Sequence, residues 1–313
     1  MKVRLIEMPY AMGFHASGMG AGPRRFLEGG ADGCLRCLGA VVRVERIETG
    51  RSLEADPRGP APQGRRDGNM PGAGTPASAL ALDAMLAGRV REAGVNGEFP
   101  LVLAGDCNSA LGTLAGLQAQ GHRVGIVWFD AHGDFNTPET SPSGWFDGMA
   151  LAAATGRCWR EETRTGLGLE AIDERDVVLA GARALDPLER TSLEDSGVTR
   201  VTALEPGGIR PGGALEAALA ALAGRVDGVY LHVDLDALDA GEAVVNRYSA
   251  PGGFTLQELE SAIAVTGGSI RILSAALTAY DPSVDIGGRG LAAGLRVLQA
   301  ITRAAGARDR RPW

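Results

Sequence analysis

The stretch RVGIVWFDAHGD, residues 123–134, decides the fold prediction, because an apolar run passes directly into three polar side chains. Consecutive apolar residues are typical of a parallel strand that is buried on both faces. We therefore predict a strand over residues 123–129. In a parallel α/β sheet, ligands bind beyond the carboxyl ends of the strands. Asp130, His132 and Asp134 thus stand where a functional site is expected.

The rest of the chain repeats this alternation of short apolar runs with longer segments of helical character. Such alternation implies crossovers and a mostly parallel sheet that helices cover on both faces. We predict a single α/β domain over residues 1–313. Further strands are expected at 3–8, 41–47, 99–104, 176–180, 198–203, 228–233 and 270–276. Helices are expected at 23–27, 77–93, 110–119, 149–154, 187–196, 213–223, 256–266 and 290–305.

One segment departs from this pattern. Residues 50–75 carry Gly, Pro, Arg and Asp with almost no large apolar residue. Such a segment buries too little surface to order itself, so we predict a mobile surface loop. A plain insertion is favoured over a loop that covers a site.

Composition excludes several function classes. A formal net charge of −7 without a long basic run argues against a nucleic-acid partner. No stretch approaches about 18 uninterrupted apolar residues, so no membrane-spanning helix is expected. The N-terminal residues resemble a strand and not a signal peptide, and we expect a cytoplasmic protein.

Four cysteines do not form a disulfide framework in a chain of this length, and Cys34 and Cys37 are interpreted as two thiols at the end of a helix.

Two more predicted strands run into acidic residues at their carboxyl ends. The strand at 99–104 is followed by Asp106 and Cys107, and the strand at 228–233 by Asp234, Asp236 and Asp239. Unpaired, so much negative charge in one cleft would be costly, and bound cations remove the conflict.

The donor types indicate which cations. Alternation along an extended chain is expected to place Asp130, His132 and Asp134 on one side, and Asp234 and Asp236 likewise. Oxygen-rich ligation with one imidazole favours Mn²⁺-like ions, and bridging carboxylates would hold two metals close together. Helix caps and solvated strand-end acids are the alternative, which acidic motifs at two separate strand ends disfavour.

Three motifs resemble those of the ureohydrolases, the arginase and agmatinase family of binuclear manganese enzymes. Residues 130–138, DAHGDFNTP, resemble the family's DAHxDxNTP, and residues 234–239, DLDALD, resemble DVDxxDP without its proline. Residues 104–109, AGDCNS, resemble GGDHS, and weaker echoes are AGP at 21–23, PGG at 251–253 and DP at 281–282. The resemblance implies a three-layer α/β fold around an eight-stranded, mostly parallel sheet. It also suggests a homo-oligomer, either a trimer or a hexamer.

The resemblance further implies a ligand set and a mechanism. One metal would be held by Cys107, Asp130, Asp134 and Asp234, and the other by Asp130, His132, Asp234 and Asp236. A hydroxide between the ions would attack the planar carbon of an amidine or guanidine, and Asp134 would help to orient it. Cleavage of the C–N bond would follow protonation of the leaving amine.

Four residues fall on or near the positions with which the arginase branch holds the amino-acid end of its substrate. They are Asn136, Ser143, Asp186 and Glu189. Amide and hydroxyl groups suit a carboxylate, and acidic groups suit an ammonium. The motifs that contain them are also ordinary turn sequences.

Two departures from the family pattern concern the metal and the proton. Cys107 replaces a histidine ligand, and a thiolate prefers zinc, copper(I) or iron to Mn²⁺. We therefore expect a first site that is weak for manganese, with zinc or another divalent metal as an option and a free buried thiol as the alternative. Asp147 replaces a histidine to which proton shuttling is assigned. It is a candidate acid, a partner for a cationic substrate group, or a cap for the helix near Met149.

A third departure concerns the substrate. Ala279 occupies the place of the family's guanidinium-binding glutamate. Loss of such a hydrogen bond would cost a few kcal/mol, or roughly a hundredfold in affinity, so L-arginine is in doubt as the substrate. His232, two residues before Asp234, is a further catalytic candidate. It is a satisfied strand-end histidine, a partner that acts through a metal ligand, or a replacement for the missing histidine.

These observations together predict a metal-dependent hydrolase of a linear C–N bond in an amidine, guanidine or ureido compound. The expected partner is a small-molecule substrate. The alternative is a non-catalytic or regulatory member of the family with a partly lost metal site.

Overall fold

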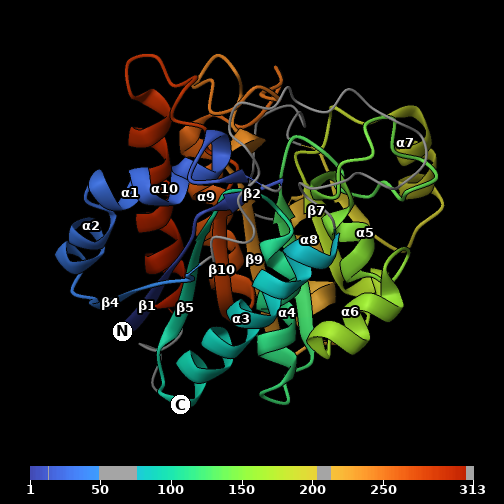
Figure 1. Cartoon of the computed structure of the whole chain (residues 1–313), viewed down its shortest axis with the longest axis horizontal. Coiled ribbons are helices and arrows are strands. Elements are labelled where there is room, and N and C mark those ends of the chain that lie inside the picture. Colours follow the sequence, from blue (N-terminus) through green and yellow to red (C-terminus); the bar gives the residue numbers. More distant parts are fainter. Residues whose placement is uncertain (13, 49–75, 203–212, 308–313) are drawn as a thin grey trace.

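Eight parallel strands form the central sheet of the computed structural model, whose described residues are 1–12, 14–48, 76–202 and 213–307 (Figure 1). From one edge to the other the strands are β4 (Val41–Arg46), β1 (Lys2–Met8), β5 (Phe99–Ala104), β10 (Ile272–Thr278), β9 (Gly228–Asp234), β6 (Val124–Phe129), β7 (Val177–Ala180) and β8 (Thr199–Val201). Every pair within this sheet is parallel, which confirms the predicted fold class.

Helices cover both faces of the sheet and make a three-layer structure (Figure 1). One face carries α1 (Gly22–Glu28), α2 (Ala31–Cys37), α8 (Ala214–Ala223), α9 (Leu256–Ser269) and α10 (Arg289–Ala305). The other carries α3 (Pro76–Val95), α4 (Ser109–Gln118), α5 (Ala150–Ala154), α6 (Arg160–Leu167) and α7 (Pro187–Glu194). No helix in the described ranges is long and apolar enough to cross a bilayer.

Each strand divides its side chains between two hydrophobic cores. Leu101 and Leu103 of β5 belong to the core under α9 and α10, whereas Val102 and Ala104 belong to the core under α3 and α4. Successive side chains of a strand point to opposite faces, so a continuous apolar run is what a sheet buried on both sides requires.

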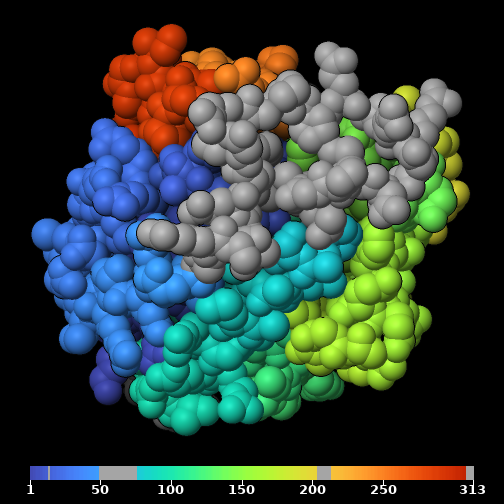
Figure 2. Space-filling model, viewed as in Figure 1, coloured from blue at the N-terminus to red at the C-terminus, as the bar shows by residue number. Residues whose placement is uncertain are grey.

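The two ends of the described chain pack together on one side of the molecule. In Figure 2 the blue N-terminal segment adjoins the red C-terminal segment, and α10 contacts both α1 and α2. Gly22 at the start of α1 lies against the loop after β10, where an added Cβ would come within 2.1 Å of the Tyr280 carbonyl oxygen. The AGP motif therefore holds α1 close to the carboxyl edge of the sheet.

The predicted elements differ from the observed ones at a few places. The helix expected at 149–154 begins with a 3₁₀ turn at Asp147–Met149 and continues as α5. Helix α6 was missing from the prediction because it buries only Thr163 and so lacks an apolar stripe. Cys34 and Cys37 are free thiols in the last part of α2, as predicted. The proposed loop at 50–75 lies outside the described residues.

The carboxyl group of Asp83 on α3 allows a test of how a buried acid affects the pH dependence of protein stability. Its side chain is fully buried, and neither carboxyl oxygen has a hydrogen-bond partner in the described part of the chain. Burial, and then the charge of Asp106, raises the pKa of Asp83 well above its ordinary value. A carboxyl group whose pKa is higher in the folded state than in the unfolded state destabilises the folded protein as pH rises above about 4, the pKa of the unfolded state.

We therefore expect Asp83→Asn to change stability little at pH 4 and to stabilise the protein increasingly toward pH 8. The gain at pH 8 should reach at least about 1.4 kcal/mol, the equivalent of one pKa unit. Urea unfolding of both proteins across this range measures it. A difference between the two proteins that stays constant with pH would contradict the assignment.

Candidate metal centre

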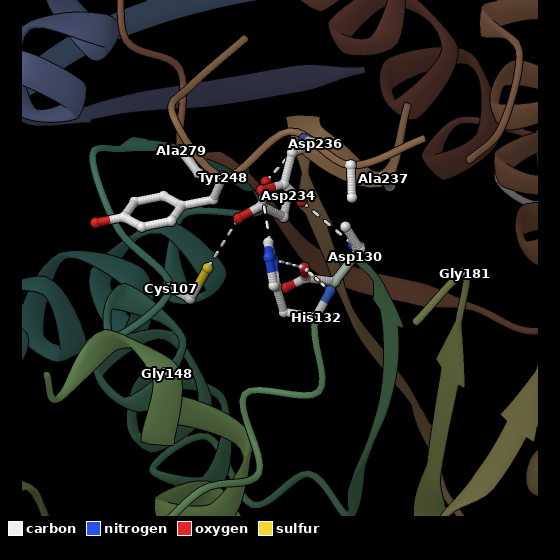
Figure 3. A network of polar contacts seen from close by, with 12 residues as sticks. Cys107, Asp130, His132, Gly148, Gly181, Asp234, Asp236, Ala237, Tyr248 and Ala279 are labelled. Atoms are coloured by element: carbon white, nitrogen blue, oxygen red, sulfur yellow. Dashed lines mark hydrogen bonds and ion pairs between the residues drawn. The ribbon is translucent and has the colours of Figure 1, made fainter. Parts of the chain in front are cut away.

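The order of the strands brings the predicted residues together. β5, β10, β9 and β6 are consecutive neighbours in the sheet, so their carboxyl ends adjoin. Cys107 follows β5, Ala279 follows β10, Asp234 ends β9 and Asp130 follows β6. Figure 3 shows these residues converging on one region.

The turn after β6 positions three of the candidate ligands. β6 ends at Phe129, so strand alternation does not place Asp130, His132 and Asp134, and that part of the prediction was wrong. Instead the chain turns sharply: the His132 amide donates to Asp130 Oδ1 at 2.7 Å, and Asp134 adopts a left-handed backbone with φ of 48°. The Asp134 carbonyl accepts hydrogen bonds from Leu151 and Ala152 at the start of α5. These contacts attach the turn to the start of α5.

The turn after β9 is joined to the first. Asp234 is the last residue of β9, and its Oδ1 accepts a hydrogen bond of 2.8 Å from the Asp236 amide in a 3₁₀ turn at Leu235–Ala237. Asp236 therefore also owes its position to a turn and not to strand alternation. Its Oδ1 accepts from the Ala131 amide at 3.2 Å, and its Oδ2 accepts from Asn246 Nδ2 at 3.0 Å.

Two groups of potential ligand atoms result, and they share Asp130. One consists of Cys107, Asp130 and His232, and the other of Asp130, His132 and Asp236. Within each group the ligand atoms lie within 4.8 Å of one another. In the second group, His132 Nδ1 is 3.3 Å from Asp130 Oδ1 and 3.5 Å from Asp236 Oδ2 (Figure 3).

Asp134 provides a separate indication that a cation belongs here. The residue is 7% exposed, and its Oδ2 is buried without a hydrogen-bond partner among the described residues. A buried carboxylate oxygen without a donor is costly. A divalent cation beside Asp134 would satisfy this oxygen, so the donor set fits a metal site.

The pKa shifts of the carboxyl groups point the same way. Burial raises the pKa of Asp234 and Asp130, and the charge of Asp236 raises both further. Burial also raises the pKa of Asp134, with a further contribution from Asp130. Asp236 is the exception: burial opposes its ionisation, but His132 outweighs burial and lowers the pKa of Asp236. Without a cation, the cluster therefore resists full ionisation.

Cys107 belongs to the same electrostatic cluster. Its Sγ lies 3.2 Å from Asp234 Oδ2 and 3.6 Å from Thr278 Oγ1. Burial raises the pKa of the Cys107 thiol well above its ordinary value, and the charges of Asp134 and Asp234 raise it further. Only a nearby cation would favour the thiolate at neutral pH.

His232 lies in β9 and is fully buried. Its ring stacks on Trp128 of β6 with centroids 3.6 Å apart, because the two residues are partners in the strand register. Nδ1 is 2.8 Å from the Tyr230 hydroxyl and Nε2 is 3.2 Å from Thr278 Oγ1. Burial lowers the pKa of His232 to about 3, so the ring is neutral.

A cavity of about 610 Å³ opens above the cluster. Most of the predicted site residues line it, namely Cys107, His132, Asp134, Asn136, Ser143, Asp147, Asp186, Glu189, Asp234 and Asp236. Asp130 and His232 lie behind this lining. His232 therefore cannot touch a substrate in the cavity, and its predicted catalytic role is restricted to acting through a metal or a neighbouring residue.

The predicted substrate-binding residues form a hydrogen-bonded group on the cavity wall. Asn136 Nδ2 donates to Asp186 Oδ2 at 2.9 Å, and Glu189 accepts from the Phe135 and Asp186 amides. Asp186 also precedes the first residue of α7, so the expected turn chemistry is present beside the cavity. Ser143 is exposed at the rim, where its Oγ accepts from the Trp145 amide.

Two further acidic groups of the cavity have raised pKa values. Burial raises the pKa of Asp147 to about 6. Burial and then the charge of Asp147 raise the pKa of Asp106 to about 7. Asp147 begins the 3₁₀ turn before α5, and its Oδ1 accepts from the Gly148 amide.

The wall at Ala279 is apolar. Ala279 packs with Ala11 and Met19, and both Ala279 and Met19 face the cavity. Ala279 has a left-handed backbone with φ of 61°, and its carbonyl accepts from Asn246 Nδ2 at 2.9 Å. No carboxylate is contributed by this position of the wall.

Sequence reasoning missed Arg183 and Asn246. The Arg183 guanidinium donates to the carbonyl oxygens of Gly181, Asp236, Ala237, Leu238, Ala250 and Pro251. It thereby joins the turn after β9 to the segment at 250–251, whereas Asn246 bridges Asp236 and Ala279. Arg183 stands three residues after the carboxyl end of β7, which is a signal that the sequence analysis did not use. Asn246 follows no predicted strand directly, so no local signal pointed to it.

Comparisons with known proteins agree with this geometry. The model of the Arginase family matches residues 2–303. An arginase of Bacillus caldovelox is 34% identical over 284 residues, which cover 90% of this chain and 92% of that protein. An arginase of Bacillus subtilis is 36% identical over 208 residues, or 66% of this chain and 70% of that protein. A crystal structure of Bacillus subtilis arginase superposes with a TM-score of 0.81 at 29% identity and covers 96% of this chain and 98% of that one.

Proposed function

This chain belongs to the arginase family, and we propose that it is a divalent-metal-dependent hydrolase of a linear C–N bond in a guanidine- or amidine-type substrate. The observation that carries the proposal is the pair of donor groups that share Asp130 below a cavity of about 610 Å³. Structural acids at helix caps would not converge in this way from three strand ends.

The residues proposed to hold the metals are those that the family resemblance implies, and they overlap in part with the two groups of donor atoms in the structure. Cys107, Asp130, Asp134 and Asp234 would hold one ion, and Asp130, His132, Asp234 and Asp236 the other. Manganese is the ion proposed for the oxygen-rich second position, whereas Cys107 admits zinc or another divalent metal at the first. When bound, such ions would supply a hydroxide nucleophile at neutral pH and stabilise the developing negative charge.

The chain's own residues would handle the proton and the geometry. Asp134 would accept a hydrogen bond at its unpartnered Oδ2 and orient the attacking group. Asp147 faces the cavity, and its raised pKa near 6 suits a carboxyl that donates a proton to a leaving amine near neutral pH. Asp134 is buried, whereas Asp147 is partly exposed toward the cavity.

The substrate is proposed to be an amino-acid derivative. Asn136 and Ser143 would bind its carboxylate, and Asp186 and Glu189 its ammonium. Because Met19 and Ala279 present an apolar wall, the reacting group would lack the carboxylate partner that a guanidinium needs. A neutral ureido group therefore suits this part of the cavity better than the guanidinium of L-arginine.

The test is metal content followed by a substrate panel. We expect protein reconstituted with Mn²⁺ to bind one or two divalent ions per chain and to release amine or urea from at least one amidine, guanidine or ureido amino acid. Protein with two bound ions and no turnover on the whole panel would overturn the proposal. The same sample in a sedimentation experiment tests the proposed trimer or hexamer, and fractionation of cells tests the proposed cytoplasmic location.

Cys107→His tests the departure at the first metal position. We expect manganese content and turnover to rise together, because imidazole binds Mn²⁺ better than a thiol that must first lose its proton. Elemental analysis and an activity assay measure the two quantities. Cys158→Ser is the matched control, since Cys158 is also a buried free thiol but belongs to the core next to α5 and α6. Higher manganese content without any gain in turnover would show that metal binding does not limit the reaction.

A further inference from the structure

We propose that His232 is a direct metal ligand together with Cys107 and Asp130, so that the first metal position is a sulfur–nitrogen–oxygen site that selects zinc-type ions over manganese. This inference rests on the proposed function and departs from the ligand set that the family resemblance implies. It assigns a role to a histidine that the reaction itself does not use.

The distances allow a shared ion. Cys107 Sγ, an Asp130 carboxylate oxygen and a ring nitrogen of His232 lie within 4.8 Å of one another, and all three residues are buried. A tetrahedral zinc ion with bonds of about 2.0–2.3 Å holds its donor atoms roughly 3.3–3.8 Å apart, so the three side chains would have to move together by about 1 Å. Small adjustments of the side chains would therefore close the site.

The His232 ring is held in the orientation that a ligand needs. Metal-bound histidines usually hydrogen-bond through the ring nitrogen that does not face the metal. Here the Tyr230 hydroxyl lies 2.8 Å from Nδ1 of His232, within hydrogen-bond distance, and Nε2 of His232 lies 3.2 Å from Thr278 Oγ1. Thr278 Oγ1 is also 3.6 Å from Cys107 Sγ, so the imidazole nitrogen and the sulfur face the same small space.

Residues of β6 complete this arrangement. Trp128 stacks on the His232 ring at an interplanar angle of 11°, which fixes the ring plane. The indole Nε1 of Trp128 also donates to Asp130 Oδ2 at 3.0 Å. One side chain thus positions both the nitrogen and the oxygen donor.

A second observation points to a ligand at this place. Asp134, whose buried Oδ2 has no partner in the described ranges, is close enough to Cys107 to act on its thiol electrostatically. A cation bound to Cys107 and His232 would satisfy this oxygen or neutralise its charge. The hydrogen bonds among the described residues do neither.

The donor types decide the selectivity. At a given nitrogen and sulfur site, Mn²⁺ has the lowest affinity of the first-row divalent ions. A thiolate together with an imidazole favours zinc. The neighbouring group of Asp130, His132 and Asp236 offers oxygen and one imidazole. We therefore expect a mixed pair of metals when zinc and manganese are both present, with zinc at the Cys107 position.

X-ray absorption on the full-length protein tests the inference without relying on activity. Metal-free protein is loaded with one equivalent of Zn²⁺, and the His132→Asn variant is treated in the same way so that His132 cannot contribute an imidazole. We expect a sulfur scatterer at about 2.3 Å and an imidazole shell at about 2.0–2.1 Å in both samples. Sulfur without imidazole in His132→Asn overturns the role of His232 and leaves the proposed function in place.

Two substitutions then separate a ligand from a positioning residue. His232→Phe keeps the stack on Trp128 but removes the nitrogen, and we expect zinc affinity to fall by about 10–100-fold or more, as measured by competition with a chelator. Thr278→Val removes the hydroxyl between the ring and the sulfur and should retain the sulfur-to-cobalt charge-transfer band of Co²⁺-loaded protein. If His232→Phe binds zinc as tightly as the wild-type protein does, His232 is not a ligand.

Matched controls exclude general damage. His122→Phe and Cys158→Ser change the same residue types away from the site and should leave zinc affinity unchanged. Circular dichroism verifies that each variant is folded. Failure of wild-type protein to bind any divalent ion would overturn the proposed function as well as this inference.

Discussion

Asp130→Asn is expected to lower divalent-metal affinity by at least about 100-fold and to abolish C–N hydrolysis. Even partners of metal ligands cost about 10–100-fold when they are removed, and Asp130 is shared by both groups of ligand atoms. Its carboxylate also accepts from the His132 amide and from Trp128 Nε1. Asparagine keeps the shape of the side chain but loses the charge that would bridge two cations. Titration with Mn²⁺ and Zn²⁺, followed by an activity assay, measures both effects.

The matched control for this prediction is Asp227→Asn. Asp227 precedes β9 at the opposite end of the sheet and pairs with Arg123 at the surface. Its substitution should leave metal content and turnover unchanged. Wild-type metal content in folded Asp130→Asn protein would show that the two donor groups do not depend on Asp130.

Arg183→Met is expected to destabilise the protein by about 3–5 kcal/mol and to disorganise the turn that carries Asp236. The guanidinium donates to six backbone carbonyl oxygens, and each carbonyl that stays buried without a donor costs about 1–3 kcal/mol. Water can replace part of this loss, because the side chain is only half-buried. Urea unfolding measures the stability, and metal titration reports on the turn.

Arg123→Met serves as the control for Arg183→Met. Arg123 is exposed and makes a surface ion pair with Asp227, so its loss should cost no more than about 1 kcal/mol. If both substitutions destabilise the protein equally, the carbonyl contacts of Arg183 do not hold the turn in place. If Arg183→Met keeps full stability and binds metal more tightly, the effect of Arg183 on the site is electrostatic, because removal of a positive charge favours a bound cation.

Much of the fold was predictable because its signals are local. The apolar run at 124–129 marks a strand buried on both faces, and α10 shows a buried stripe at Ala293, Val297 and Ile301 with helical spacing. α6 lacked such a stripe and was missed. The spacing of apolar residues therefore reveals helices that bury one face in a hydrophobic core. It does not reveal helices that lie over the core with few buried side chains.

The candidate site was predictable as a set of residues but not as an arrangement. Acidic motifs after three strands identified Asp130, His132 and Asp234 through the rule that parallel strands present ligand sites at their carboxyl ends. Strand alternation, which was expected to place Asp130 and His132 on one side, does not apply to them, because they lie in a turn held by a backbone hydrogen bond. Such turns depend on contacts with other strands, which a local pattern does not contain.

By itself the sequence determined the α/β class, the acidic strand ends and the three departures at Cys107, Asp147 and Ala279. Only the tertiary structure decided that β5, β10, β9 and β6 are neighbours, that His232 faces Cys107 beneath the cavity, and that Arg183 holds the turn after β9. The physical reason is the range of the interactions. Burial periodicity and turn chemistry act over a few residues. Strand order and metal-ligand geometry depend on residues far apart in the chain, such as Cys107 and Thr278, which are 171 positions apart.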